Sequence, residues 1–434
     1  MNPGTAGSGD LRRRFVSALS RAQVIAFWIF VVAIPLNLIA MTAGAAIGIA
    51  ATLGLYISAP YRRHRTPLDL AVIIYLAAIG ASLLLGRTDA ITFRTATSFW
   101  PLAVFYFSYS VARYRRDSGE RWIWVMLCTA LVLSIYSIVQ HFTGIDWFNT
   151  AFGGQPKVYR HMLAGSAHRY VSVGRYDRHS NHAFAVMFFL SLALSEVLFG
   201  SQKTGNRIVK TVGKWGAGLL FAAELVVTYV RAAWMGMAAA VFFLGMAKGR
   251  RWLLAMILGG AVLFGAVCEF SPSIESKLKV TFDSKYPANR QRLFLWARSL
   301  EMFADHPVFG IGWGNYQKVC PEYIDKVDPK FPFKFRSHNL FLNHLAETGL
   351  VGLLALLFLF FKIFSSLYSC VKRSGQGGCP GYRLCMGMLA AMIAFVIGSI
   401  TTDAYYNGDV SFVMWFLLGQ ALGARTDSDD PAAD

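Results

Sequence analysis

The sequence predicts an all-α polytopic membrane protein with about twelve transmembrane helices, and three observations support this prediction. First, 55% of the 434 residues are hydrophobic and only 15% are charged, with a mean hydropathy of +0.44. Second, the apolar residues are gathered into long runs, and a soluble protein of this size could not bury so much apolar surface. Third, the basic residues concentrate in alternate loops between these runs.

The apolar runs are roughly 17 to 25 residues long, which is the length that crosses about 30 Å of hydrocarbon. Because the bilayer core has no water to satisfy backbone groups, each run is expected to form a helix. The polar N-terminus leads into the first run without a cleavage site, so this run is expected to be retained. The predicted spans are residues 22–40, 43–59, 67–86, 95–112, 121–142, 180–200, 212–230, 232–247, 251–268, 339–368, 384–402 and 409–424.

The short loops predict how the spans are oriented. If the N-terminus is cytoplasmic, the short loops on the opposite side contain only Arg87, Arg94 and Arg231. This distribution is the positive-inside pattern, so both termini are predicted to be cytoplasmic. The basic stretches that then fall on the cytoplasmic side are RRHR (62–65), RYRR (113–116), residues 203–214, KGRR (248–251) and KR (372–373).

The spans and loops divide the chain into four parts. Residues 1–268 hold spans one to nine and include a basic periplasmic loop at 143–179. A large periplasmic loop follows at 269–338, and then come spans ten to twelve at 339–424 and a cytoplasmic tail at 425–434. Long loops cross the membrane regardless of their charge, so these two loops leave the predicted orientation unchanged.

The formal net charge of +18 raises the question of a nucleic-acid partner. Because the basic residues follow the membrane topology, we expect membrane lipids and no nucleic acid. The excess of cations on the two outer loops has two explanations that stay open at this point. One is attraction to anionic lipid headgroups, and the other is an anionic substrate.

The large outer loop is predicted to contain an amphipathic helix. Within residues 289–307, apolar residues recur at helical spacing among charged ones, which indicates a helix that lies on the membrane or closes over the bundle. GIGWGN (310–315) follows. No strand precedes it and no helix is evident directly after it, so we expect a tight turn and not a nucleotide-binding loop. The apolar positions of the predicted helix are Leu293, Trp296, Ala297, Leu300, Phe303 and Ala304.

The six cysteines form no CxxC pair and no zinc-ligand spacing. Cys370, Cys379 and Cys385 fall in or near a predicted cytoplasmic segment, where thiols stay reduced. A disulfide between Cys268 and Cys320 is compatible with the predicted topology, but nothing in the sequence requires it.

Arginines supply the first candidate functional residues. Arg231 lies at the predicted outer boundary between spans seven and eight, where an arginine that snorkels to the surface and a functional arginine are both common. Arg290 and Arg292 open the predicted amphipathic helix, and guanidinium groups near a helix N-terminus can bind phosphate oxygens. On sequence alone, a solvated or lipid-contacting face is the simpler interpretation of these two residues.

His338 is the second kind of candidate and lies at the outer start of the predicted span 339–368. An interfacial histidine near a helix end is common. Arg336 is only two residues away, however, and nearby cations favour the neutral imidazole, which is the form that accepts a proton. A metal site is not expected, because His338 and His344 do not share a helix face and no HExxH motif occurs.

Two acidic residues lie near these candidates. Glu347 follows His338 by nine residues, about 14 Å deeper along a straight helix, and is expected to pack against another helix. Asp403, in TTDAYYNGD, lies at the outer end of the eleventh predicted span. It could orient an arginine or the histidine, or it could be an ordinary helix-end residue.

Three segments together resemble the O-antigen ligase/polymerase superfamily of bacterial envelope glycosyltransferases. They are TYVRAAW (228–234), NRQRLFLWARSLEMFADHPVFGIGWGNY (289–316) and SHNLFLNHLAETGLVG (337–352). The resemblance rests on R-x-x-x-W, HP-x-x-G-x-G-x-GN, SHN and E-x-G-x-x-G in this order between membrane spans.

The resemblance implies a specific reaction. Ligases of this family take a polysaccharide from undecaprenyl pyrophosphate on the periplasmic side of the inner membrane and attach it to a sugar hydroxyl of lipid A–core. They are thought to need no metal or nucleotide cofactor and to invert the anomeric centre. Essential family residues carry over to Arg231, Arg292 and His338, with Asp403 a further match, while Val230 stands where many relatives have serine. The resulting expectation is His338 as general base, with substrate contacts from Arg231, Arg292, Arg290, Arg336 and Asp403.

Other functions fit parts of the same pattern. An O-antigen polymerase or a protein O-oligosaccharyltransferase would use the same kind of donor with a different acceptor, and the SHN histidine favours the ligase. A lipid-linked glycan transporter would also have many spans, but the sequence shows no repeat of six spans. A non-catalytic assembly protein would leave the clustered Arg and His residues without a role.

Overall fold

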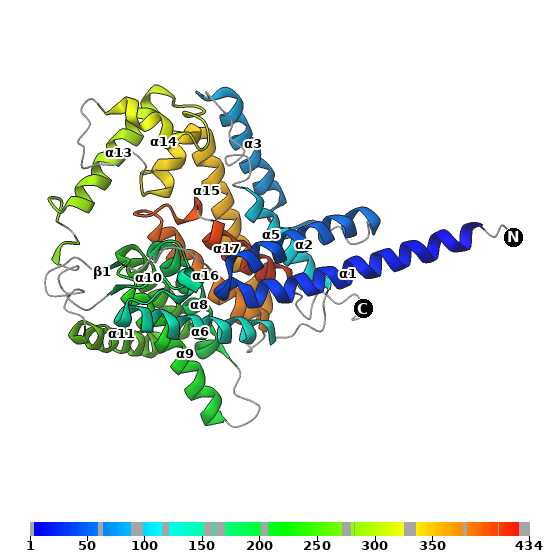
Figure 1. Cartoon of the computed structure of the whole chain (residues 1–434), viewed down its shortest axis with the longest axis horizontal. Helices are drawn as coiled ribbons and strands as arrows, with labels where there is room; N and C mark the ends of the chain where they lie inside the picture. Colours follow the sequence, from blue (N-terminus) through cyan, green and yellow to red (C-terminus); the bar gives the residue numbers. More distant parts are fainter. Residues whose placement is uncertain are drawn as a thin grey trace.

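The long apolar runs of the sequence form helices that pack side by side into a bundle (Figure 1). The computed structural model describes residues 4–59, 64–87, 99–114, 121–151, 159–160, 170–200, 207–270, 279–281, 283–324, 336–375, 380–406 and 408–424. Each predicted span coincides for most of its length with one helix of the bundle, and the first, 22–40, also includes the start of α2. These helices are α1 (Gly4–Leu36), α2 (Leu38–Ser58), α3 (Asp69–Leu85), α5 (Trp100–Tyr114), α6 (Arg121–Thr143), α8 (His179–Phe199), α9 (Arg207–Val227), α10 (Arg231–Lys248), α11 (Arg250–Phe270), α15 (Leu340–Ser374), α16 (Pro380–Gly398) and α17 (Gly408–Gly423).

The helices confirm the predicted fold class. Six of them, α1, α2, α6, α8, α15 and α16, are long and apolar enough to cross a membrane, and α3 and α17 are shorter apolar helices. The chain is therefore an all-α membrane protein. The count of about twelve crossings stays a prediction, because α5, α9, α10 and α11 fall in neither group among the described residues. The tail at 425–434, Arg94 and parts of both predicted outer loops lie outside the described residues.

Two helices form the centre of the bundle. Nearly every residue of α8 and α17 is buried, as expected for helices that are apolar on all sides. Helix α17 lies against α5 and meets α1 through aromatic rings, with the Phe30 and Phe416 centroids 4.8 Å apart. The central packing of α8 and α17 holds the ends of the surrounding helices in fixed positions.

The short elements lie between the long helices. Two strands of two residues each, β1 (Tyr159–Arg160) and β2 (Tyr170–Val171), pair antiparallel, which the all-α prediction did not include. In the view of Figure 1, β1 and α13 lie on the left, whereas α1 projects to the right. The remaining short elements are α7 (Trp147–Ala151), α13 (Pro287–Asp305), α14 (Tyr316–Val319), η3 (Cys320–Tyr323) and η4 (Ala404–Tyr406).

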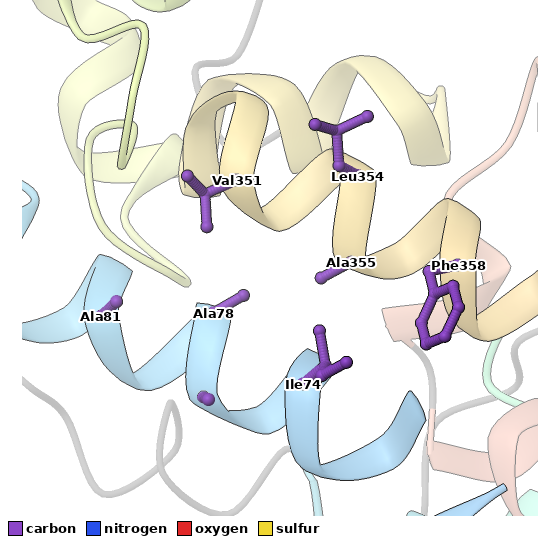
Figure 2. A pocket seen from close by; sticks show the side chains of 8 residues that line it. Ile74, Ala78, Ala81, Val351, Leu354, Ala355 and Phe358 are labelled. Carbon is purple, nitrogen blue, oxygen red and sulfur yellow. The ribbon is translucent and has the colours of Figure 1, made fainter. Parts of the chain in front are cut away.

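Helix α15 is broken at Gly349, which has φ of +64° and ψ of −163°. Before the break, His344 contacts Tyr75 of α3, while Ser82, two turns further along α3, donates to the carbonyl of Glu347. After the break, the chain returns along α3 in the opposite sense, so that Val351 faces Ala81 (Figure 2). The predicted span 339–368 is therefore two helical segments that meet at Gly349, whereas the predicted separation of His338 and Glu347, which precede the break, stays a prediction.

The GIGWGN segment fills the break in α15. Gly310, Gly312 and Gly314 all have positive φ, which confirms the predicted tight turn. The amide of Gly312 donates to the carbonyl of Glu347 over 2.9 Å, and the amide of Leu350 donates to the carbonyl of Pro307 over 2.9 Å. These bonds satisfy backbone groups that the break exposes. The short helix α14 begins directly after this turn, where none was predicted.

Helix α13 confirms the predicted helix in the large loop, but a different face packs against the protein. Leu295, Ser299 and Met302 are its buried residues, and they lie against α14, η3 and the first part of α15. Leu293 and Leu300, which belong to the predicted apolar stripe, are 49% and 50% exposed. Helix α13 carries apolar residues on two sides. The periodicity of the sequence selected the side that faces outward and not the side that packs against the protein.

Candidate active site

The sequence-predicted site residues come from four segments that meet at one end of the bundle. Arg231 opens α10, Arg292 lies in the first half of α13, and His338 directly precedes Asn339, which caps α15. Asp403 lies between α16 and η4. The contacts below join these segments, which are up to 172 residues apart in sequence.

Arg231 is held by neutral groups. Its Nη2 donates to Oδ1 of Asn289 over 2.8 Å, and its Nη1 donates to the carbonyl of Val280 over 3.2 Å. The ring of Tyr286 lies 6.0 Å from the guanidinium carbon. Among the described residues, no carboxylate pairs with Arg231. The guanidinium is therefore held by hydrogen bonds to groups that do not neutralise its charge.

Arg292 adds a second positive charge to the same region. It follows Asn289 by three residues on α13, which places both residues on one face of the helix. Burial lowers the pKa of the Arg292 guanidinium, the charge of Arg231 lowers it further, and Asp403 raises it, with the net direction downward. Within the described part of the chain, no hydrogen bond or ion pair satisfies this side chain. Because arginine keeps its proton in proteins, a bound anion would relieve this repulsion.

His338 and Asp403 form the acid–base part of the site. Nδ1 of His338 lies 3.5 Å from Oδ1 of Asp403, and both side chains are mostly buried, at 27% and 15% exposed. Burial raises the pKa of Asp403, but the hydrogen bond and charge of His338 and the charge of Arg336 outweigh it, so the pKa lies below its ordinary value. An aspartate at Nδ1 leaves Nε2 as the nitrogen that can accept a proton from a substrate.

The backbone around His338 is strongly constrained. His338 has φ of +52°, and Tyr229, two residues before Arg231, has φ of +58°. These are the two non-glycine residues with positive φ in the described ranges, and such conformations cost about 1–3 kcal/mol each. Nε1 of Trp296 donates to the carbonyl of Ser337 over 3.0 Å, and the amide of Leu340 donates to the carbonyl of Ser399 over 2.9 Å. One of the two strained residues is therefore a candidate site residue itself, and the other lies two residues before Arg231.

Arg336 joins the site, and Arg290 does not. The Arg336 guanidinium lies 4.3 Å from the centre of the Tyr406 ring, and its charge acts on Asp403. Arg290 is exposed on α13, two residues before Arg292, and residues two apart on a helix do not face the same side. The structure therefore brings together five of the six predicted site residues.

His344 and Glu347 have structural surroundings, and for Glu347 this agrees with the expectation that it packs against another helix. His344 is fully buried, and its ring nitrogens lie 2.9 Å from the hydroxyls of Tyr75 and Tyr406. The carboxylate of Glu347 accepts a hydrogen bond from the amide of Tyr316 over 3.2 Å. Both residues fix the first part of α15 against the GIGWGN turn and α3.

Sequence reasoning missed several residues that shape the site. Asn289 and Trp296 contact Arg231 and Ser337 across 58 and 41 residues of sequence. Tyr406 connects Arg336 to His344. The available signal was the helical spacing of Asn289, Arg292 and Trp296 on α13, but nothing in the sequence indicated which segment this face would meet.

An apolar groove lies outside the candidate site. A groove of about 600 Å³ lies between α3 and the second part of α15, and Figure 2 shows that only apolar side chains line it. It contains none of the candidate residues, so it takes no part in the chemistry described above. No group of three or more His, Cys, Asp or Glu residues within the described ranges is arranged to hold a metal ion. Cys320 is a free, buried thiol.

Part of the chain matches a known protein family. A family model described as O-Antigen ligase matches residues 216–357. This segment includes Arg231, Arg292, Arg336 and His338 and ends before Asp403. Among curated proteins, none matches the chain. Members of the matched family are glycosyltransferase-like enzymes that act on lipid-linked glycans. Over this third of the chain, the sequence is therefore similar to the O-antigen ligase family, and this supports a relationship to the O-antigen ligase/polymerase superfamily.

Proposed function

We propose that this protein is an O-antigen ligase of the bacterial inner membrane. It transfers a polysaccharide from undecaprenyl pyrophosphate to a sugar hydroxyl of lipid A–core and thereby completes lipopolysaccharide. The observation that carries the proposal is the pair of guanidinium groups, Arg231 and Arg292, that lie in one site with His338 and Asp403 and have no carboxylate at ion-pair distance among the described residues. In this proposal the chain crosses the membrane twelve times, with cytoplasmic termini and a periplasmic site.

The arginines act on the leaving group. As the glycosidic bond breaks, the bond's electron pair goes to the pyrophosphate oxygen, and negative charge develops there. Fixed guanidinium groups in a partly dry site stabilise this charge without reorganising, which is worth about 10²–10³ in rate for a single preorganised donor. Arg231 and Arg292 supply this stabilisation from α10 and α13, and Arg336 adds a positive charge near Asp403.

His338 acts on the acceptor. Its Nε2 takes the proton of the sugar hydroxyl while the hydroxyl oxygen attacks the anomeric carbon from the side opposite the pyrophosphate, so the configuration inverts. Asp403 at Nδ1 orients the imidazole and stabilises the imidazolium that forms. Because both substrates are lipid-borne, a site at the boundary of the bundle lets their sugars meet while their lipids stay in the bilayer.

The test is transfer by the purified protein in nanodiscs, with lipid-linked polysaccharide as donor and lipid A–core as acceptor. His338→Asn is the sharpest variant, because asparagine tolerates the positive φ of this position and removes the base. We expect joined product from the wild type and a loss of about 10²-fold or more in the variant. Full activity of His338→Asn would contradict its role as base. Lengthening of the donor glycan without transfer to lipid A–core would instead identify a polymerase.

A further inference from the structure

Asn289 connects three separate segments of the site. Its Nδ2 donates to the carbonyls of Val280, Thr281 and Asp283 over 2.9, 3.1 and 2.8 Å. Its Oδ1 accepts from Arg231 over 2.8 Å. An amide has two N–H donors and one carbonyl oxygen, so the three carbonyls fix which way the side chain points. Only the oxygen is then free to face Arg231.

The same contacts hold the Arg231 guanidinium at two of its nitrogens. The carbonyl of Val280 accepts from Nη1 of Arg231 and also from Nδ2 of Asn289. Both acceptors are uncharged, so they orient the guanidinium without neutralising it. An aspartate at position 289 would neutralise Arg231, and it would have no N–H groups for the three carbonyls.

Asn289 also fixes the position of Arg231 relative to Arg292. Arg292 lies one helical turn after Asn289 on the same face of α13, and the charges of Arg231 and Arg292 influence each other. The turn of α13 that holds Arg231 therefore carries Arg292 as well. A rigid pair of cations at a fixed separation suits a ligand with two linked anionic groups.

We propose that Asn289 is a positioning residue for the donor pyrophosphate, acting through Arg231. This inference rests on the proposed function, because it takes the pyrophosphate of the lipid-linked donor as the ligand of the two arginines. Asn289 does not touch the donor itself. It holds the Arg231 guanidinium in the orientation that binds the pyrophosphate together with Arg292.

The experiment compares Asn289→Asp and Asn289→Ala with wild type in nanodiscs. Lys285→Ala is the matched control, because Lys285 is exposed in the same segment and its loss changes the net charge by the same amount as Asn289→Asp. The measurements are KM for the lipid-linked donor, KM for lipid A–core, kcat, and inhibition by inorganic pyrophosphate.

Loss of a hydrogen bond to a charged group predicts an increase of about ten- to a hundredfold in donor KM and in the inhibition constant of pyrophosphate. The acceptor KM should stay unchanged, and Lys285→Ala should stay within about twofold of wild type for every quantity. A lower yield of folded protein with unchanged donor KM would show that Asn289 only stabilises the loop, and would overturn the inference.

A double-mutant cycle covers the case in which the Asn289 variants fold poorly. Arg231→Lys retains the charge but cannot make the same two bonds, so adding Asn289→Ala to it should change donor KM by less than about twofold. If Asn289→Ala raised donor KM in the Arg231→Lys background as much as it does in the wild type, the inference would be overturned. If Arg231→Ala itself leaves donor KM and pyrophosphate inhibition unchanged, the proposed function fails at the pyrophosphate site, which is a separate outcome.

Discussion

Arg383 and Arg175 lie inside the helical bundle, whereas Arg231 and Arg292 lie at the candidate site, and the two pairs differ in their partners. Nε of Arg383 lies 2.9 Å from a carboxylate oxygen of Glu196, and Nη1 of Arg175 lies 3.9 Å from a carboxylate oxygen of Asp409. Arg231 and Arg292 have no carboxylate at ion-pair distance among the described residues.

This difference distinguishes arginines that form ion pairs within the fold from arginines for which we propose an anionic ligand. A buried charge is strongly unfavourable unless an opposite charge or hydrogen bonds compensate it. The bundle interior supplies that compensation from its own side chains. At the candidate site, we propose that a bound anion supplies the compensation. Removing a charge should therefore destabilise the protein in the first region and disable it in the second.

The largest expected effect is on stability, from Glu196→Ala. This substitution leaves the guanidinium of Arg383, which is 3% exposed, without its carboxylate. Breaking a buried pair by removing one partner costs about 3–5 kcal/mol, so the unfolding temperature in detergent should fall sharply. Replacing both residues, with Glu196→Leu and Arg383→Met together, should restore most of the stability. A Glu196→Ala protein as stable as wild type would show that the Glu196–Arg383 ion pair does not stabilise the bundle.

Arg292→Ala should have the opposite signature. We expect transfer activity to fall by about 10²–10³-fold, because a preorganised donor to the leaving group is lost. The unfolding temperature should stay the same or rise, because the substitution removes one of two repelling charges. Activity per folded molecule and thermal unfolding in the same detergent provide both readings. A loss of stability comparable to that of Glu196→Ala would place Arg292 with the structural cations.

The same contrast shows how far the sequence could predict this protein. The apolar runs were enough to predict α8 and α17, since burial on all sides leaves an unbroken apolar pattern. The break at Gly349 could not be predicted, because an isolated glycine is tolerated within a helix. It forms here because the amides and carbonyls of residues 307–312 take over the exposed backbone groups.

The candidate site was predictable residue by residue but not as an arrangement. Arg231 and Arg292 were candidates from their positions and from family resemblance, yet snorkelling explained Arg231 equally well, and a solvated or lipid-contacting face was the simpler interpretation of Arg292. Only the fold brings Arg231 of α10 to the face of α13 that carries Asn289 and Arg292, and among the described residues it places no carboxylate at ion-pair distance from either arginine. The contact between Arg231 and Asn289 spans 58 residues, and no periodicity in the sequence encodes such a contact.

Asp403→Asn tests the one carboxylate that the site does contain. Loss of the anion at Nδ1 of His338 should lower transfer by about 10²-fold, the lower end of what acid–base catalysis contributes. Since the pKa of Asp403 is depressed in the folded protein, the stability it contributes is fully present above the unfolded value of about 3.9 and is lost as pH falls through the folded value.

The pH dependence of unfolding checks this assignment. The difference in unfolding temperature between wild type and Asp403→Asn should be constant from pH 5 to 8 and should close only below about pH 4. A difference that closes between pH 6 and 7 would mean that the stability comes from another titrating group. Asp403→Glu is the matched control, because it keeps the charge and changes only its position.

The smallest effect is expected from Arg290→Ala. Arg290 was predicted as a phosphate contact together with Arg292, but it is exposed and lies on a different side of α13. An exposed arginine is solvated and screened by salt, so its removal should change donor KM and transfer rate by no more than about twofold. The measurement is the donor KM at low and at physiological ionic strength. Arg290→Ala could instead lose as much activity as Arg292→Ala. In that case the exposure of Arg290 would not show that it is outside the site, and substrate binding would have to rotate α13 to bring Arg290 into the site.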